Sequence, residues 1–392
     1  MRKNICELCS SISDTYKGNA EKVVLINTSD VYDGKCTNHT LVENKQLRGQ
    51  FKKTFKPNDI LYSEIRPANR RFAYIDFDTN NYIASTKLMV LRAKEGVNPK
   101  YLYQILRGNS TINALQLLAE SRSGTFPQIT FSELSNIEVN IPSEDVQNMV
   151  VSILSSLDAK IETNNKLNEK LEEMAQAIFK SWFVDFEPFK DQPFHETELG
   201  MIPEGWKVVS LCDIANFTNG LAMQKYRPND DEAYLPVLKI KELRQGFCDD
   251  TSEICTNDIS EDYIAEDGDV IFSWSGTLLV DIWCGGECGV NQHLFKVTSE
   301  DYNKWFYYYW IKKHLEEFIR IAKDKAVTMG HIKREHLRNA LVVVPDKKTM
   351  HNADKIFSPI INRIIESRIE SKRLASLRDT LLPRLMSGEI KV

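Results

Sequence analysis

The feature that most constrains the fold of this chain is an internal duplication. The segment TFPQITFSELSNIEVNIP, from Thr125 to Pro142, aligns without a gap with TMGHIKREHLRNALVVVP, from Thr328 to Pro345, at an offset of 203 positions (328 minus 125). Solenoid repeats are much shorter, roughly 20 to 50 residues each. The offset therefore indicates that a whole domain, together with the segment that follows it, occurs twice.

The same offset continues into two long helix-forming segments. Apolar residues recur there at spacings of four and three, which is typical of helices that pack as a coiled coil. Asn164 and Asn165 interrupt the pattern of the first segment. The stripes are Val150, Leu154, Leu157, Ile161, Leu167, Leu171, Met174 and Ile178, and then Ile356, Ile360, Ile364, Leu374, Leu377, Leu381 and Leu385.

A long helix with one apolar stripe cannot bury that stripe alone. The simplest solution is that the two helices pack against each other, antiparallel, and separate two globular domains. A helix of about 40 residues is roughly 60 Å long, so such a pair would act as a spacer. The alternative is that both are ordinary core helices of larger domains.

The segments between the helices are rich in short strand patterns. DVIFSWSG and NIEVNIP are apolar or alternating runs bounded by Gly, Asp, Asn and Pro. PKYLYQILRG is expected to be a surface helix, and the aromatic stretch NKWFYYYWIKKHLEEFI a half-buried one. We expect an α+β fold with pseudo-twofold symmetry: strand-rich mixed domains at 1–142 and, after a linker, within 188–345, and antiparallel spacer helices at 143–187 and 346–392.

Composition excludes some classes of protein. There is no run of 18 apolar residues, so no membrane-spanning helix is expected, and MRKNICELCSS lacks the apolar core of a secretory signal. We therefore expect a cytoplasmic protein with reduced thiols. Cys6 with Cys9, and Cys284 and Cys288 with His293, do not form the two well-spaced pairs of a structural zinc site, so no metal is expected.

The net charge of −5 argues mildly against nucleic acid, because phosphate contacts need Lys and Arg. The distribution of charge matters more than its sum, however, and a mildly acidic chain can carry local basic faces.

Two stretches resemble a known family. LNEKLEEMAQAIFKSWFVDFEPF, followed by LGMIPEGWKVVSLCDIA, is similar to the central conserved region of type I restriction–modification specificity (S) subunits, and LRDTLLPRLMSGEIKV to their second conserved region. The resemblance covers the whole chain. One departure is that the second half opens with IPEGWKVVSL, whereas the first starts almost directly at ICELCSSI, so its leading segment is shortened.

The resemblance implies a non-catalytic subunit whose two target-recognition domains each read one part of a bipartite, asymmetric site in double-stranded DNA. The helices would set the gap and dock two methyltransferase (M) subunits, which use S-adenosylmethionine, and two motor (R) subunits, which use ATP and Mg²⁺. This chain would bind no cofactor. The sequence agrees, because it contains no Asn-Pro-Pro-Tyr-like motif and no Walker A loop.

Candidate DNA contacts lie on loops in equivalent places of the two halves and carry the donors and acceptors that read bases or bind phosphates. The alternative for each is a plain turn or a solvated surface, and Trp274 is interpreted as a core residue. The candidates are Arg66, Asn69, Arg70, Arg71, Lys87, Arg122, Ser123, Thr125 and Gln128 in the first half, and Lys225, Arg227, Lys239, Lys241, Ser275, Thr277, Gln292, His293, Lys325, Thr328 and His331 in the second.

The two sets differ at equivalent positions, for example Arg66 against Ser275, so the two halves should read different sequences. The candidate subunit-interface residues are Leu167, Leu171, Met174, Ile178, Trp182, Phe183, Phe186, Leu374, Leu377, Leu381 and Leu385. The aromatic cluster could instead pack against the second recognition domain of the same chain. The alternative functions are a coiled-coil interaction scaffold without sequence-specific DNA binding, and an enzyme, for which no cofactor site is found.

Overall fold

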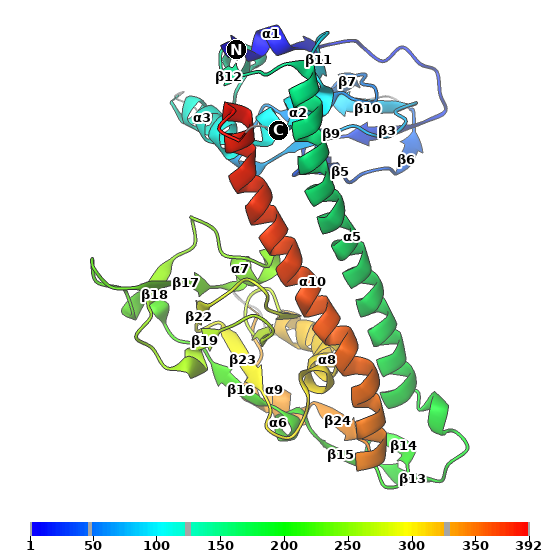
Figure 1. The fold of residues 1–392 in the computed structure, drawn as a ribbon. Helices are drawn as coiled ribbons and strands as arrows, with labels where there is room; N and C mark the ends of the chain where they lie inside the picture. Colours follow the sequence, from blue (N-terminus) through cyan, green and yellow to red (C-terminus); the bar gives the residue numbers. More distant parts are fainter. Residues whose placement is uncertain (1, 46–48, 122–126, 325–329, 391–392) are drawn as a thin grey trace. The chain divides into compact units, whose positions relative to one another are not determined.

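The computed structural model describes residues 2–45, 49–121, 127–324 and 330–390 (Figure 1). Contacts divide the chain into two compact units. Unit 1 comprises Met1–Ala159 and Leu374–Val392, and unit 2 comprises Lys160–Arg373. Each long helix therefore contributes residues to both units.

Unit 1 contains two four-stranded sheets. In both, the central strands are more buried than most of the edge strands. The first sheet has the order β2 (Cys9–Ile12), β11 (Leu88–Ala93), β8 (Ile60–Ser63), β9 (Phe72–Tyr74) and is antiparallel. The second has the order β6 (Leu41–Glu43), β3 (Lys22–Ile26), β10 (Tyr82–Ser85), β7 (Phe51–Lys53), and β3 and β10 are parallel.

Unit 2 repeats this topology. Its antiparallel sheet has the order β16 (Asn216–Asn219), β23 (Leu294–Thr298), β20 (Val270–Ser273), β21 (Leu279–Ile282). Its other sheet has the order β18 (Ile254–Thr256), β17 (Tyr234–Leu238), β22 (Cys288–Val290), β19 (Ile264–Ala265), and β17 and β22 are its parallel pair. Because the parallel pair falls at the same place in both units, the predicted duplication holds at the level of strand order.

Smaller elements are also repeated. β1 (Arg2–Asn4) pairs with β12 (Glu138–Asn140), as β15 (Lys207–Ser210) pairs with β24 (Leu341–Val344). The short helices α1 (Ile5–Leu8) and α4 (Phe131–Ser135) correspond to α6 (Leu211–Ile214) and α9 (Arg334–Asn339). Unit 2 adds α7 (Ile240–Gln245) and the hairpin of β13 (Phe194–Thr197) and β14 (Gly200–Pro203), and unit 1 adds the hairpin of β4 (Val31–Tyr32) and β5 (Lys35–Cys36).

Of the helices beside the sheets, α2 (Pro99–Arg107) is more buried than the sequence suggested, whereas α8 (Lys304–Asp324) is half-buried as expected. Unit 1 has α2 and α3 (Asn109–Glu120), and unit 2 has the single helix α8. The expectation that PKYLYQILRG is a surface helix is wrong: every residue from 101 to 107 is buried. Its apolar side chains belong to the same core as β8, β11 and the start of α5, which cover the helix on more than one face.

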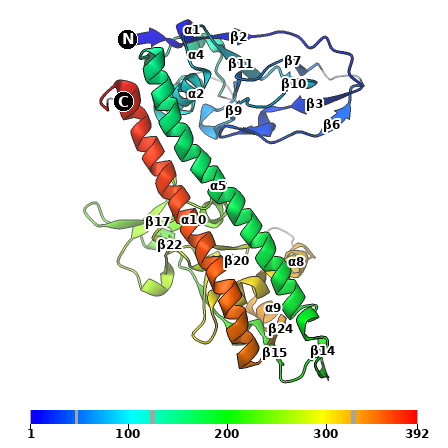
Figure 2. The ribbon, with the colours of Figure 1, turned by 45° about the vertical axis from the view of Figure 1, so that its right-hand side comes forward.

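The two long helices, α5 (Glu144–Phe183) and α10 (Lys347–Ser387), pack together along their length (Figure 1, Figure 2). Partners on the two helices run in opposite directions: Phe179 contacts Phe357, and Asn164 contacts Ser371. The pair is therefore antiparallel. The predicted α+β fold, with two strand-rich domains and a packed pair of long helices, is confirmed.

The contact seam between α5 and α10 differs from the predicted stripe. Asn164, expected to interrupt the pattern, is 1% exposed and donates to Glu370 Oε2 at 2.8 Å. Ser367, fully buried on α10, donates to Asn168 Oδ1 at 2.7 Å. A polar layer thus occupies the seam, and its groups satisfy one another, which is the condition for burying them at low cost.

A candidate nucleic-acid interface

In each unit, two loops that the sequence singled out separately pair with one another. In unit 1, Ile65 and Gln128 form an antiparallel bridge, and the Arg66 amide donates to the Pro127 carbonyl at 3.1 Å. In unit 2, Ser275 and His331 form the same bridge, and the Gly276 amide donates to the Gly330 carbonyl at 2.9 Å. The loop after β8 or β20 therefore lies beside the loop that leads into α4 or α9. The bridges also correct the expected pairing of Arg66 with Ser275: the counterpart of Ser275 is Ile65, and that of Arg66 is Gly276.

A third loop joins each pair. In unit 1, Lys87 Nζ donates to Gln128 Oε1 at 3.4 Å and lies 3.9 Å from the Glu64 carboxylate. In unit 2, Ser275 Oγ lies 2.9 Å from His293 Nδ1. Polar side chains from three loops thus converge at one end of each antiparallel sheet. We call these clusters loop site 1 (residues 64–71, 85–87 and 127–129) and loop site 2 (residues 274–277, 291–293 and 330–332).

The backbone of loop site 1 turns sharply. Arg66 and Arg70 adopt left-handed conformations, with φ of 45° and 53°, on either side of a one-turn helix from Pro67 to Asn69. The Arg66 side chain is exposed and forms no hydrogen bond or ion pair with the described residues, and the same holds for the Asn69 side chain. These two side chains are free to contact a ligand.

The other two arginines of this loop are engaged within the chain. Arg70 donates to Asp33 Oδ1 at 3.0 Å and to Asn109 Oδ1 at 3.1 Å. Arg71 donates to the Ser29 carbonyl at 3.1 Å, and its guanidinium lies 5.4 Å from the centre of the Tyr32 ring. Both side chains are half-buried, so they hold the loop in place and have little freedom to meet a ligand.

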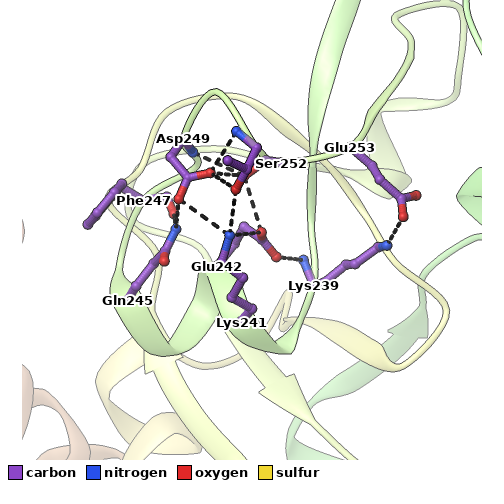
Figure 3. Close-up of polar contacts among 9 residues, drawn as sticks. Lys239, Lys241, Glu242, Gln245, Phe247, Asp249, Ser252 and Glu253 are labelled. Atoms are coloured by element: carbon purple, nitrogen blue, oxygen red, sulfur yellow. Dashed lines mark hydrogen bonds and ion pairs between the residues drawn. The ribbon is translucent and has the colours of Figure 1, made fainter. Parts of the chain in front are cut away.

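Several cations proposed for the second half are paired with carboxylates of their own domain (Figure 3). Lys239 pairs with Glu253, which also lies 3.2 Å from the Arg227 guanidinium. Lys241 lies 3.4 Å from the Asp249 carboxylate. A hydrogen bond from Thr251 lowers the pKa of Asp249 to about 2, so this carboxylate stays ionised at neutral pH and keeps Lys241 paired. These cations are weaker phosphate ligands than their sequence suggested.

The remaining candidates fall into two groups. Lys225 and Thr277 are exposed, and Gln292 is half-buried beside His293. Arg122, Ser123, Thr125, Lys325 and Thr328 lie outside the described residues.

Trp274 was interpreted from the sequence as a core residue, but it is half-buried at the wall of an open pocket of about 490 Å³. The same pocket is lined by Lys333 and Arg334, which the sequence reasoning did not select. The duplication could have identified them, because they replace Thr130 and Phe131 of the first half at the offset of 203.

The candidate subunit-interface residues divide by burial. Phe183 is 1% exposed and packs on the rings of Trp305 and Phe306, with centroids 5.7 and 5.9 Å away. This is the packing within one chain that the sequence left open as the alternative. Leu385 is buried as well, whereas Met174 and Leu377 are 49% and 46% exposed. The half-buried residues are Leu167, Leu171, Ile178, Trp182, Phe186, Leu374 and Leu381.

Two other features, a metal centre and a membrane-spanning helix, are not found among the described residues. Within the described ranges no cluster of His, Cys, Asp and Glu could hold a metal ion. Among the helices that the structure describes, none is both long and apolar enough to cross a membrane. All eight cysteines are free thiols.

Comparison with known proteins gives consistent results. The family model described as "Type I restriction modification DNA specificity domain" matches twice, at residues 3–173 and 203–376. The type I restriction enzyme HindI specificity subunit of Haemophilus influenzae is 30% identical over 98% of either chain. The MjaIX specificity subunit of Methanocaldococcus jannaschii is 30% identical over 76% of this chain and 71% of its own.

Among solved structures, the S subunit of a type I restriction–modification system from M. genitalium covers 98% of this chain and 96% of its own, with a TM-score of 0.51 and 16% identity. At this identity the similarity concerns the fold alone.

Proposed function

Because this chain belongs to the family of type I restriction–modification DNA specificity subunits, we propose that its two units read two different parts of one bipartite DNA target. As a specificity subunit of such a system, the chain is non-catalytic by family. Its task is to direct the chemistry of other subunits to a DNA sequence.

Loop site 1 and loop site 2 are built on the same backbone scaffold but carry different side chains, and this supports the proposal. Loop site 1 and loop site 2 share strand order, backbone pairing and register. At equivalent positions loop site 1 has Ile65 and Gln128, and loop site 2 has Ser275 and His331. Because base reading depends on the pattern of donors and acceptors that enters a groove, these sites should prefer different bases.

The residues of loop site 1 suit base reading in the major groove. A free arginine such as Arg66 can donate two hydrogen bonds to guanine O6 and N7, and a glutamine such as Gln128 can pair in the same way with adenine N6 and N7. Lys87, which lies beside Gln128, would contact phosphate or guanine. We expect the exposed Asn69 to contribute a further donor and acceptor.

The long helices would perform the second part of the function. We propose that α5 and α10 set the gap between the two parts of the target and dock two M and two R subunits. Support comes from their antiparallel packing, and the exposed apolar side chains of Met174 and Leu377 are candidate contacts for a partner. S-adenosylmethionine, ATP and Mg²⁺ would be bound by those partners, and the complex would work in the cytoplasm, where the DNA is.

A coiled-coil scaffold without DNA recognition is the alternative function. It accounts for the helix pair but gives no reason for two matched clusters of polar loops on duplicated domains.

The decisive experiment is methylome sequencing of cells that express this chain with its cognate M subunit. We expect one new motif that is bipartite and asymmetric, with methyladenine on each strand. A palindromic motif would contradict the reading of two different parts. The absence of any new motif, with an M subunit shown to be active, would favour the scaffold.

A further inference from the structure

The pocket beside loop site 2 has an apolar floor and a cationic rim. Trp274, Phe295 and Ile332 form the floor, and Lys333 and Arg334, at the start of α9, form the rim. Trp274 and Phe295 lie with ring centroids 5.9 Å apart, and Phe295 and Ile332 are buried. The pocket therefore offers a ligand a flat apolar surface next to two positive charges.

Polar groups that could read a base at this floor are already used. Trp274 Nε1 donates to Asn219 Oδ1 at 3.0 Å, and Asn219 Nδ2 donates to the Gly220 carbonyl at 3.3 Å. Base reading requires free donors and acceptors arranged to match a base edge. The Trp274 indole and the Asn219 amide do not provide them, whereas His331, which also lines the pocket, belongs to the residues proposed to read bases at loop site 2.

The rim, by contrast, has free cationic groups. Arg334 uses Nη2 to donate to the Phe217 carbonyl at 3.1 Å, and its guanidinium lies 5.9 Å from the centre of the Phe295 ring. These contacts fix its position and leave Nε and Nη1 without a partner in the part of the chain that the structure describes. Lys333 is exposed, and its ammonium forms no ion pair with the described residues.

The pocket adjoins the loops proposed to meet DNA. The Ile332 amide donates to the Trp274 carbonyl at 3.0 Å, and the neighbouring residues Ser275 and His331 form the bridge of loop site 2. A duplex bound at loop site 2 would therefore pass next to Lys333 and Arg334.

Among the residues that the structure describes in unit 1, the equivalent positions do not form this surface. At the offset of 203, Thr130 and Phe131 stand in place of Lys333 and Arg334. Thr130 caps α4 through its bonds with Glu133, and Glu64 follows β8 where Trp274 follows β20. A carboxylate at this position would repel a phosphate, so the surface belongs to unit 2 alone.

We propose that this pocket is a seat for the sugar–phosphate backbone of DNA. Deoxyribose packs on the half-buried Trp274 ring, which Phe295 supports from within, and phosphate oxygens accept hydrogen bonds from Lys333 and Arg334. Such contacts add affinity and fix the register of the duplex without reading its sequence. The inference rests on the proposed function and adds that unit 2 supplies a backbone anchor that unit 1 lacks.

The test measures DNA binding by the full chain in complex with its M subunits, with a duplex that contains the target and a scrambled duplex, over a range of salt concentrations. For a double variant, Lys333→Ala with Arg334→Ala, the affinity for both duplexes should fall by the same factor, on the order of tenfold at low salt. The slope of log K against log salt should decrease by about two, since each phosphate contact contributes about 0.9. The methylated motif should stay the same.

Three further variants sharpen the test. Arg338→Ala removes an exposed cation from the same short helix outside the pocket, and it should leave the salt slope nearly unchanged. Trp274→Ala should lower the affinity for both duplexes with no change of slope, whereas Trp274→Phe, which keeps a flat apolar ring, should retain most of it. The Phe variant guards against a loss that comes only from misfolding.

Three results would overturn the seat. A double variant that behaves like Arg338→Ala would show that the rim meets no phosphate. A methylated motif that changes with the double variant would show that the pocket reads bases. If the unmodified complex itself showed no salt-dependent DNA binding, the proposed function would fail together with the seat, and this result is distinct from the first two.

Discussion

At the scale of the residue, Arg66 combines an unfavourable backbone with a free side chain. A left-handed conformation costs a residue other than glycine about 1 kcal/mol, and the loop after β8 contains two of them within five residues. Pro67, buried between them, and the contacts of Arg70 with Asp33 and Asn109 hold this turn in place. Arg66 is thereby presented to solvent with little freedom of the backbone beneath it, which suits a group that must meet a base edge.

Arg66→Ala should weaken binding to the target duplex by about 1–3 kcal/mol, because a bidentate contact with a base is lost. The motif should relax at one position in the part read by unit 1. Methylome sequencing and binding measurements check both effects. Lys56→Ala, which removes an exposed cation at the opposite end of β8, is the control. An equal loss on scrambled DNA would instead identify Arg66 as a phosphate ligand.

Protonation of His314 should make the stability of unit 2 depend on pH. Burial lowers the pKa of this imidazole below its usual value of about 6.5, although the bond to the Leu341 carbonyl, 2.9 Å from Nε2, and the nearby Glu317 partly offset that effect. The unfolded chain binds the proton more readily, so stability is complete above the unfolded pKa and is lost as pH falls towards the folded pKa.

His314→Gln should therefore flatten the pH dependence of thermal unfolding between about pH 7 and pH 5. The measurement compares the melting temperature of the two proteins at each pH, so that titration of other groups cancels. Parallel curves for the variant and the unmodified protein would show that His314 does not contribute.

At the scale of the element, each unit places an aspartate, buried in unit 1 and half-buried in unit 2, just before its central strand. Asp59, fully buried, accepts from the Lys56 amide at 2.8 Å and takes two hydrogen bonds of 2.7 Å from Arg92. Asp269 accepts from the Glu266 amide at 2.9 Å and lies 3.2 Å from Lys296 Nζ. The turn before β8 or β20 is thus tied to a neighbouring strand of the same sheet, which helps to fix where loop site 1 or loop site 2 begins.

Asp59→Asn should destabilise the protein by about 2 kcal/mol, less than for a fully buried pair because Arg92 is 30% exposed. Arg92→Lys, which keeps the charge and loses the paired geometry, should cost less. Denaturant unfolding measures both variants. Equal stability of Asp59→Asn and the unmodified protein would show that the pair contributes nothing.

A buried and an exposed position in the last quarter of α5 should respond differently to truncation. Phe183→Ala would leave a cavity among Trp206, Trp305 and Phe306 and should cost about 4 kcal/mol. Met174→Ala, at an exposed position of the same helix, should change stability by less than about 0.5 kcal/mol.

If the exposed face of α5 docks a partner, Met174→Asp should weaken co-purification with the M subunit while the melting temperature stays constant. Unchanged co-purification would exclude Met174 from that interface.

At the scale of the whole molecule, the duplication supports the proposed reading of an asymmetric site. Both units keep the framework and differ in the loops, so each half of the target can change without rebuilding the other. We propose that residues 1–142 and 188–345 are the exchangeable recognition domains and that 143–187 and 346–392 are the helical regions between them.

Replacing residues 1–142 with the equivalent segment of a relative of different specificity should change one part of the methylated motif and leave the other part and the gap as they were. The methylome of cells that express the chimera with the M subunit gives the answer. A change in both parts would show that the two domains do not read independently.

Three features could be predicted from the sequence: the duplication, the α+β class and the two long helices that pack together. Each depends on a repeat or on a periodicity that is local in the chain. Only the tertiary structure decided which side chains are available. Several findings depend on contacts between residues far apart in sequence. Three loops converge at each site, Arg70 and Arg71 are engaged within the chain, and Lys239 and Lys241 pair with carboxylates. In the same way, α2 is buried and Asn164 lies in the helix seam. Trp274 shows the same limit, since an indole that follows a buried strand belongs to the core or to a pocket wall according to what lies opposite it, and here that is the start of α9, some 60 residues later.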